Sequence, residues 1–313
     1  MSILSIIDIL RVSFNKVARK LWLAAIPVLL DIFFWAGPKL SIAPVVEQTI
    51  DTLRGAMEMT SPPGNLDANV AEMFEMTIEM LRSTLGRTNL FALLAWGRLG
   101  VPSIAGIEPI DPSTDWVIEL STYWQTFLAQ LVIVALGLLI ASAFLAMLAQ
   151  ETRYERVDGE RLLRRTPLYW LYLGIIVLPL SILGLFVLGI GLLFGPFVIF
   201  VGVFLVWMML YLTFIPQAVT LSEANPFQAL INSFTVVRLN FWPTVGLVLL
   251  SNLINVGLGF IWARLLLGSS LGTGVAILAN AYVGTSTTLA FFIFYQDRFA
   301  AWHELLEQQR SQQ

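Results

Sequence analysis

One acidic residue lies inside a strongly apolar run near the start of the chain. Asp31 falls within "LWLAAIPVLLDIFFWAG", one turn after Pro27 and close to the end of the run. An ionisable side chain in a membrane segment is costly to desolvate, which makes Asp31 a candidate proton or cation site. The alternative is a salt bridge or hydrogen bond near the membrane interface, with Lys39, Arg98 or Arg264 as a partner.

Three asparagines form a second candidate group. Asn252 and Asn255 lie in one apolar run and Asn280 in the next, each near the middle of its run. Hydrogen bonds from amide side chains between membrane helices contribute roughly 0.6–2 kcal/mol each, so helix packing explains the group. Together with Asp31, the same side chains would also line the path of a small transporter or channel.

Charged residues gather where the apolar runs end. Asp297, in "FYQDRF", follows the last run, and we expect it to pair with a basic residue of the interfacial segments, such as Arg238 or Arg19. The segment 151–166 holds five arginines interleaved with four acids. Its net charge is therefore small, and the sequence does not predict a lipid-binding patch there.

The residue types needed for catalysis are scarce. Glu72, Glu75 and Glu79 share a helical face, for which we expect a solvated surface. There is no cysteine and one histidine, His303, which excludes disulfides, thiolate catalysis and Cys-ligated metals. The sequence has no glycine-rich phosphate loop and no Ser and His pair fit for a triad. We therefore expect no enzymatic activity, no catalytic residues, no cofactor and no metal.

The elements that position these residues are those of a polytopic membrane protein. Of 313 residues, 57% are hydrophobic and 12% are charged, whereas a soluble domain has about 25% charged residues. The net charge of −3 argues against nucleic acid as a partner. Six apolar runs approach or exceed the roughly 20 residues that span a bilayer: 18–37, 124–148, 168–188, 196–215, 242–263 and 272–294. The glycine and proline residues of "LGIGLLFGP" at 188–196 separate the third run from the fourth.

The predicted fold is all-α, a single integral membrane domain over 1–313 with about six transmembrane helices. Of 18 Lys and Arg residues, 12 fall in the two terminal segments, 151–166 and 216–241. The excess of basic residues on the cytoplasmic side of membrane proteins places both termini in the cytoplasm. We expect a multi-pass protein of the bacterial plasma membrane, with 38–120 as an extracytoplasmic insertion.

Apolar residues at helical spacing predict two amphipathic helices in this insertion, on either side of "SPPGN" at 61–65. The second is acidic and rich in methionine. It is either a docking surface for another protein or a cap that packs on the bundle.

The segment "NPFQALINSFTVVRLNFW" at 225–242 predicts an amphipathic interfacial helix between two spans. Asn225 is a suitable N-cap, and Pro226 suits the first helical position. "SFNKVARKLW" at 13–22 matches "SFTVVRLNFW" at 233–242, and "RLLRRTPLYW" is a looser version. We therefore expect three helical hairpins, each entered through an interfacial segment.

The stretches "IPQAVTLSEANPFQALINSFTVVRLNFWPTVGLVLL" and "AYVGTSTTLAFFIFYQDR" resemble the membrane-domain family named after glycerophosphoryl diester phosphodiesterases. The shared pattern is a span, Pro216 and Glu223, an "AL..S...V..NFW" helix, two more spans, and a tyrosine with a "D.R"-like exit. The resemblance covers about 210–298, and "LLDIFFWAGPKL" is similar to openings of uncharacterised bacterial relatives. It implies a six-helical membrane domain without catalysis of its own, since the family name comes from members fused to a soluble phosphodiesterase domain.

The residues thus favour a non-enzymatic membrane protein that binds or supports lipids or other membrane proteins. The alternative is a small transporter or channel that uses Asp31 and the three asparagines.

Overall fold

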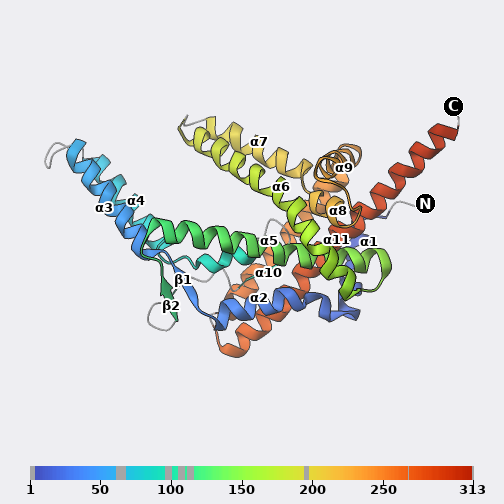
Figure 1. Cartoon of the computed structure of the whole chain (residues 1–313), viewed down its shortest axis with the longest axis horizontal. Helices are drawn as coiled ribbons and strands as arrows, with labels where there is room; N and C mark the ends of the chain where they lie inside the picture. Colours follow the sequence, from blue (N-terminus) through green and yellow to red (C-terminus); the bar gives the residue numbers. More distant parts are fainter. Residues whose placement is uncertain are drawn as a thin grey trace.

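The computed structural model describes residues 4–60, 68–95, 101–104, 110, 116–193, 197–266 and 268–311 (Figure 1). Within these ranges the chain is almost entirely helical, and the predicted all-α class is confirmed. The elements are α1 (Ile6–Arg19), η1 (Leu21–Ala24), α2 (Ala25–Ala36), β1 (Lys39–Ser41), α3 (Ala43–Thr60), α4 (Ala68–Thr84), η2 (Leu90–Ala95), β2 (Val117–Glu119), α5 (Tyr123–Tyr154), α6 (Gly159–Leu193), α7 (Phe197–Tyr211), α8 (Ile215–Thr220), α9 (Pro226–Leu239), α10 (Phe241–Leu266) and α11 (Ser270–Ser311).

Five helices in the described part of the chain are long and apolar enough to cross a membrane. They cover Tyr123–Tyr154, Gly159–Gly184, Ile199–Thr220, Phe241–Leu266 and Ser270–Glu304. Each contains most of one predicted run, and the break between α6 and α7 falls in the predicted segment. In the most apolar stretches of α5 and α11, 56% and 61% of the residues are buried, against 17–22% in the other three. α5 and α11 are therefore the central helices, and the others present most of their surface outward.

The first predicted run, 18–37, does not form a long helix. Residues 18 and 19 complete α1, and the backbone then leaves helical geometry at Lys20 (φ −136°, ψ 64°). A short 3₁₀ turn and α2 follow, and together they cover only Leu21–Ala36. Even if fully helical, this segment would rise about 24 Å, less than the roughly 30 Å of a bilayer core. Within the described residues there are thus five helices long enough to span a membrane and one shorter apolar segment.

The insertion at 38–120 begins and ends side by side. β1 and β2 pair in parallel, with Leu40 opposite Ile118, so the two ends of the insertion are held together at the bundle. The two predicted amphipathic helices are confirmed as α3 and α4, which extend away from the bundle as a hairpin (Figure 1). Val46, Ile50 and Ile78 form a small core between them, separate from the main one.

The predicted helix at 226–239 is confirmed with its caps. The side chain of Asn225 accepts a hydrogen bond from the Gln228 N–H, and Pro226 is the first helical residue. An amphipathic helix would have one apolar face, but here the apolar residues divide between a buried face and an exposed face. The helix packs on the protein through small residues, which leaves the large ones exposed. The residues that it buries are Ala229, Ser233, Val236 and Val237, whereas Phe227, Ile231 and Phe234 are exposed.

α1 and α9 adopt the same local structure, as their matching sequences predict. The residue that ends each helix has nearly the same backbone geometry, Lys20 at φ −136° and ψ 64° and Asn240 at φ −131° and ψ 42°. Ser13 and Ser233, at equivalent positions, are both fully buried. The looser third copy differs, because α6 runs without interruption through 161–170.

Candidate functional site

Nine charged side chains from five parts of the fold meet at one end of the bundle. We call this set the charged layer: Lys16, Lys20, Glu151, Arg153, Arg161, Arg165, Glu223, Asp297 and Arg298. It combines the end of α1, the end of α5, the start of α6, the turn between α8 and α9, and the C-terminal part of α11. Six of its members are basic and three are acidic.

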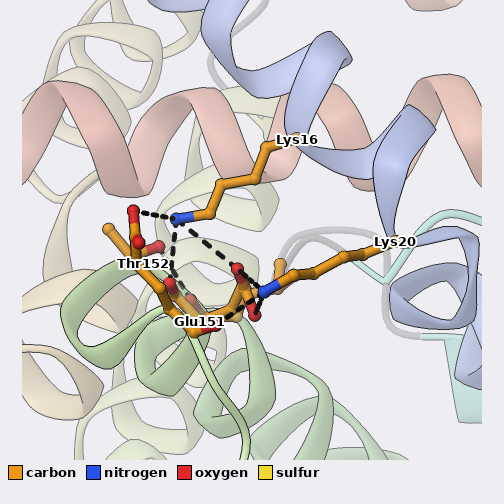
Figure 2. A network of polar contacts seen from close by, with 6 residues as sticks. Lys16, Lys20, Glu151 and Thr152 are labelled. Atoms are coloured by element: carbon orange, nitrogen blue, oxygen red, sulfur yellow. Dashed lines mark hydrogen bonds and ion pairs between the residues drawn. The ribbon is translucent and has the colours of Figure 1, made fainter.

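Glu151 is the most enclosed of these acids. It lies near the end of α5 and is fully buried, and Figure 2 shows two lysines reaching it from the end of α1. The Lys20 ammonium donates to both carboxylate oxygens at 2.8 and 3.0 Å. The Lys16 ammonium lies 3.5 Å from one of them. Two cations therefore neutralise one buried carboxylate, as a buried charge requires.

The same lysines also cap α5. The helix ends at Glu155, whose backbone is left-handed (φ 56°). Lys16 donates to the Glu151 carbonyl at 2.9 Å and Lys20 to the Glu155 carbonyl at 2.6 Å. The last carbonyls of a helix lack intrahelical partners and carry partial negative charge, so cations are stabilising there. The two lysines thus fix α1 across the end of the central helix.

A cavity of about 430 Å³ opens beside this contact. It is lined by Val12, Asn15, Lys16, Arg19, Lys20, Glu151 and Glu155. Three cations and two carboxylates face it, and Arg19 is exposed. The next residues along the chain, Leu21 and Trp22, are also exposed. Exposed apolar residues therefore directly follow, along the chain, the basic residues that line the cavity.

Glu223 is the centre of a second cluster. It has a left-handed backbone (φ 53°) in the turn after α8, which directs the chain into α9. Its carboxylate lies 3.1 Å from Arg161, 3.3 Å from Arg165 and 3.6 Å from Arg153. The Arg161 guanidinium also lies 4.5 Å from the centre of the Tyr154 ring. One acid thus holds the end of α5 and the start of α6 to the α8–α9 turn.

Asp297 has partners other than the predicted Arg238 or Arg19. Its carboxylate lies 3.7 Å from the guanidinium of its neighbour Arg298 and accepts a hydrogen bond from the Leu4 N–H. Arg298 donates to the Leu4 carbonyl at 2.8 Å. Arg238 lies exposed in the last turn of α9. The pair Asp297–Arg298 therefore binds the residues before α1.

Asp31 is fully buried on α2 and holds a loop of the insertion. The Ser103 hydroxyl donates to its Oδ1 at 2.5 Å, and the Ile104 N–H donates to Oδ1 and Oδ2 at 3.1 and 3.2 Å. Lys39, one of the partners expected for Asp31, donates instead to the Phe34 carbonyl. Another, Arg98, lies outside the described residues. Of the two roles considered for Asp31, a proton or cation site and a local salt bridge or hydrogen bond, these contacts are those of a hydrogen bond.

The same loop packs against α11. A Cβ placed on Gly284 would lie 2.1 Å from Cβ of Pro102, so only glycine permits this approach. Val101 and Ile104 are buried on either side. Residues 101–104 thus form a plug between α2 and α11, which Asp31 holds by hydrogen bonds.

The three asparagines do not converge. Asn255 donates to the Thr287 hydroxyl of α11 at 3.3 Å, whereas Asn252 donates to the Val248 carbonyl of its own helix. Asn280 lies seven residues before Thr287, roughly 10 Å along the helix. Among the described residues, its Nδ2 is buried without a hydrogen-bond partner. The hydrogen bond from the Asn255 side-chain amide to Thr287, which joins α10 and α11, is that of a packing contact.

Sequence reasoning missed the two acid clusters, the one at the buried Glu151 and the one at the partly exposed Glu223. Glu151 and Glu223 were read as part of a charged flank and as part of a family pattern, because their partners lie up to 135 residues away. One signal was available for Glu151: it lies less than one helical turn after the apolar run 124–148, so the central helix carries it into the bundle end.

Comparison of the chain with family models, with curated proteins and with solved structures finds no match. The resemblance over 210–298 therefore stays a prediction.

Proposed function

We propose that this chain is a non-enzymatic membrane protein that binds phospholipid headgroups at the cavity beside α1, in support of lipids or of neighbouring membrane proteins. The proposal places the charged layer and both termini on the cytoplasmic side of a bacterial plasma membrane. The observation that carries it is the cavity itself, which is lined by three cations and is followed along the chain by the exposed Leu21 and Trp22.

The charges of the cavity suit a phosphate group. Lys16 and Lys20 share the single carboxylate of Glu151, so one positive charge remains after that carboxylate is neutralised. Arg19 adds a second cation, whose guanidinium geometry suits bidentate phosphate binding. The exposed Glu155, 4.0 Å from Lys16, offers a place for the ammonium of an aminophospholipid.

The surroundings of the cavity suit acyl chains. Leu21 and Trp22 are exposed directly after Lys20, and Ile7 is exposed on α1. Phe227 on α9 and Trp242 at the start of α10 are exposed as well. Helices with exposed apolar and basic residues lie in the interface between headgroups and acyl chains. A lipid whose headgroup occupies the cavity would have its chains beside these side chains.

The test is a thermal-shift measurement on the full chain in detergent, with and without added lipid. Dioleoyl phosphatidylglycerol, phosphatidylethanolamine and phosphatidylcholine are compared with inorganic phosphate. A lipid at 100 times its Kd stabilises the folded state by about 2.7 kcal/mol. We expect this stabilisation to be lost in Arg19→Gln and retained in the control Arg11→Gln, which removes the same charge from an exposed position of α1 outside the cavity.

Three outcomes would contradict the proposal. Equal losses in both variants would show a general effect of charge, and equal retention would show that the cavity binds no lipid. If inorganic phosphate stabilises the protein as well as the lipids do, the ligand is a free anion. Phosphatidylethanolamine stabilising more strongly than phosphatidylglycerol would support a role for Glu155.

One observation favours transport as a second candidate function. Ser251 on α10, and Asn280 and Thr285 on α11, each have a buried polar atom without a hydrogen-bond partner within the described structure. Water would satisfy such atoms. Because the sequence lacks cysteine, Asn280→Cys introduces a single thiol. Its modification by a charged, membrane-impermeant reagent would show a water-filled path, and protection would exclude one at this position.

A further inference from the structure

The hairpin of α3 and α4 has an unusual concentration of methionine. Five of the nine methionines of the chain fall between residues 57 and 80. On α4, Met73, Met76 and Met80 are 68%, 62% and 68% exposed. They do not join α3 and α4, since Phe74 and Ile78 make that contact. Three large sulfur-containing side chains therefore stand outward from the surface of α4.

Their spacing places the three residues on one face of α4. Residues at i, i+3 and i+7 lie within an arc of about 60° on an α-helix. Neighbours at three and four residues have Cβ atoms about 5–6 Å apart. The methionine side chain is unbranched and flexible, so three thioethers at this spacing can turn toward one ion above the helix surface.

The charge of the hairpin selects the occupant. α3 and α4 carry six acidic residues and two arginines, Arg54 and Arg82. The arginines are already paired, with Glu75 at 3.1 Å and with Glu47 at 2.7 Å. A surface with this excess of carboxylates attracts cations and is repelled by anionic lipid. The methionine face is thus poorly suited to lie on a membrane and well suited to a cation.

We propose that Met73, Met76 and Met80 form a binding site for a soft monovalent cation, Cu⁺ or Ag⁺. Thioethers are soft ligands that favour such ions over Mg²⁺ or Ca²⁺, which prefer oxygen. The neighbouring Glu72 and Glu79 raise the local concentration of cations without serving as ligands. The site requires no change in the oxidation state of the ion and shares no residue with the lipid cavity beside α1.

The test uses Ag⁺, which avoids the redox chemistry of copper, with the purified full chain in a chloride-free detergent solution. Calorimetric titration measures binding, and X-ray absorption at the silver edge identifies the ligand atoms. The test variant is Met73→Leu/Met76→Leu/Met80→Leu, and the control is Met208→Leu/Met209→Leu on α7. Leucine preserves size, helix propensity and apolar surface, so only the sulfur atoms are removed.

We expect saturable binding of one Ag⁺ per chain, with sulfur neighbours in the absorption spectrum. Binding should be lost in the α4 variant and unchanged in the control. Circular dichroism checks that both variants keep their helices. The proposal is overturned if the unmodified chain shows no saturable binding, if the α4 variant binds equally well, or if the ion has only oxygen or nitrogen neighbours.

Discussion

Removal of the Asp31 carboxylate should release the plug at 101–104. In Asp31→Ala, the Ser103 hydroxyl and the Ile104 N–H lose their acceptor, which they reach at 2.5 Å and 3.1 Å. A buried donor without an acceptor costs about 1–3 kcal/mol. The Ile104 N–H is buried and the Ser103 hydroxyl is half-buried, so roughly 2–6 kcal/mol for the two donors is an upper range against the closed state. We take about 3 kcal/mol, because substitution also leaves room for water, and this shifts the opening equilibrium roughly 100-fold.

The missing cysteines make this shift measurable. Val101→Cys places a single thiol in the plug, at a position that is 1% exposed. When opening is rapid and reversible, the rate of reaction with a water-soluble thiol reagent follows the open fraction. We expect this rate to rise by roughly two orders of magnitude in the Asp31→Ala background. Asp31→Asn keeps one acceptor oxygen and should give a smaller increase.

Met59→Cys calibrates the reagent, since Met59 is 90% exposed and lies far along the chain from the plug. Its rate should be the same with and without Asp31. The reasoning is refuted if Val101→Cys reacts equally fast in both backgrounds. It is also refuted if Val101→Cys reacts as fast as Met59→Cys while Asp31 is intact, because the plug would then not be seated.

Three further predictions concern other contacts. Glu151→Gln should lower the melting temperature and loosen α1, and adding Lys20→Met should recover part of the loss. The reason is that the single change leaves the partly buried Lys20 ammonium without its counter-charge. Thermal denaturation of the single and double variants measures the coupling. Gly284→Ala should expose the plug as Asp31→Ala does, since its Cβ would overlap Pro102, and the same thiol assay applies. The hydrogen bond from Arg82 lowers the pKa of the Glu47 carboxyl. The contribution of this ion pair to hairpin stability is therefore present above the ordinary pKa of 4.5 and lost as the pH falls through the lowered value. Hydrogen exchange of α3 and α4 at decreasing pH tests this.

Local patterns predicted the elements of this fold that local chemistry decides. Asn225 and Pro226 predict the start of α9 because a cap needs only the next three residues. The first apolar run, by contrast, is interrupted at Lys20, where the backbone bends to bring an ammonium to the end of α5. That bend depends on a partner 131 residues away, and apolar periodicity contains no information on it.

A residue of the candidate site could be predicted from the sequence only where an ionisable side chain stands inside an apolar run. Asp31 stands out in any apolar run, although its partners, Ser103 and Ile104, lie in a segment without regular pattern. Glu151 looks like an ordinary member of a charged stretch, and Glu223 looks like a single loop acid between Arg165 and Arg238. Their partners are set by the packing of α1 and α6 on the central helix, which no local sequence window contains.

Three carboxylates share a physical role, which indicates where a ligand would bind. Asp31 holds the plug, Glu151 holds α1, and Glu223 holds α6 to the α8–α9 turn; in each case a carboxylate near the bundle fastens a segment distant in the sequence. Such carboxylates have their hydrogen-bonding capacity taken up by the chain and are poor candidates for proton or ion transfer. The candidates that remain are the basic side chains, which outnumber the carboxylates at this end of the bundle. Arg19, exposed beside the cavity and next to apolar residues, is therefore the side chain at which binding is best sought.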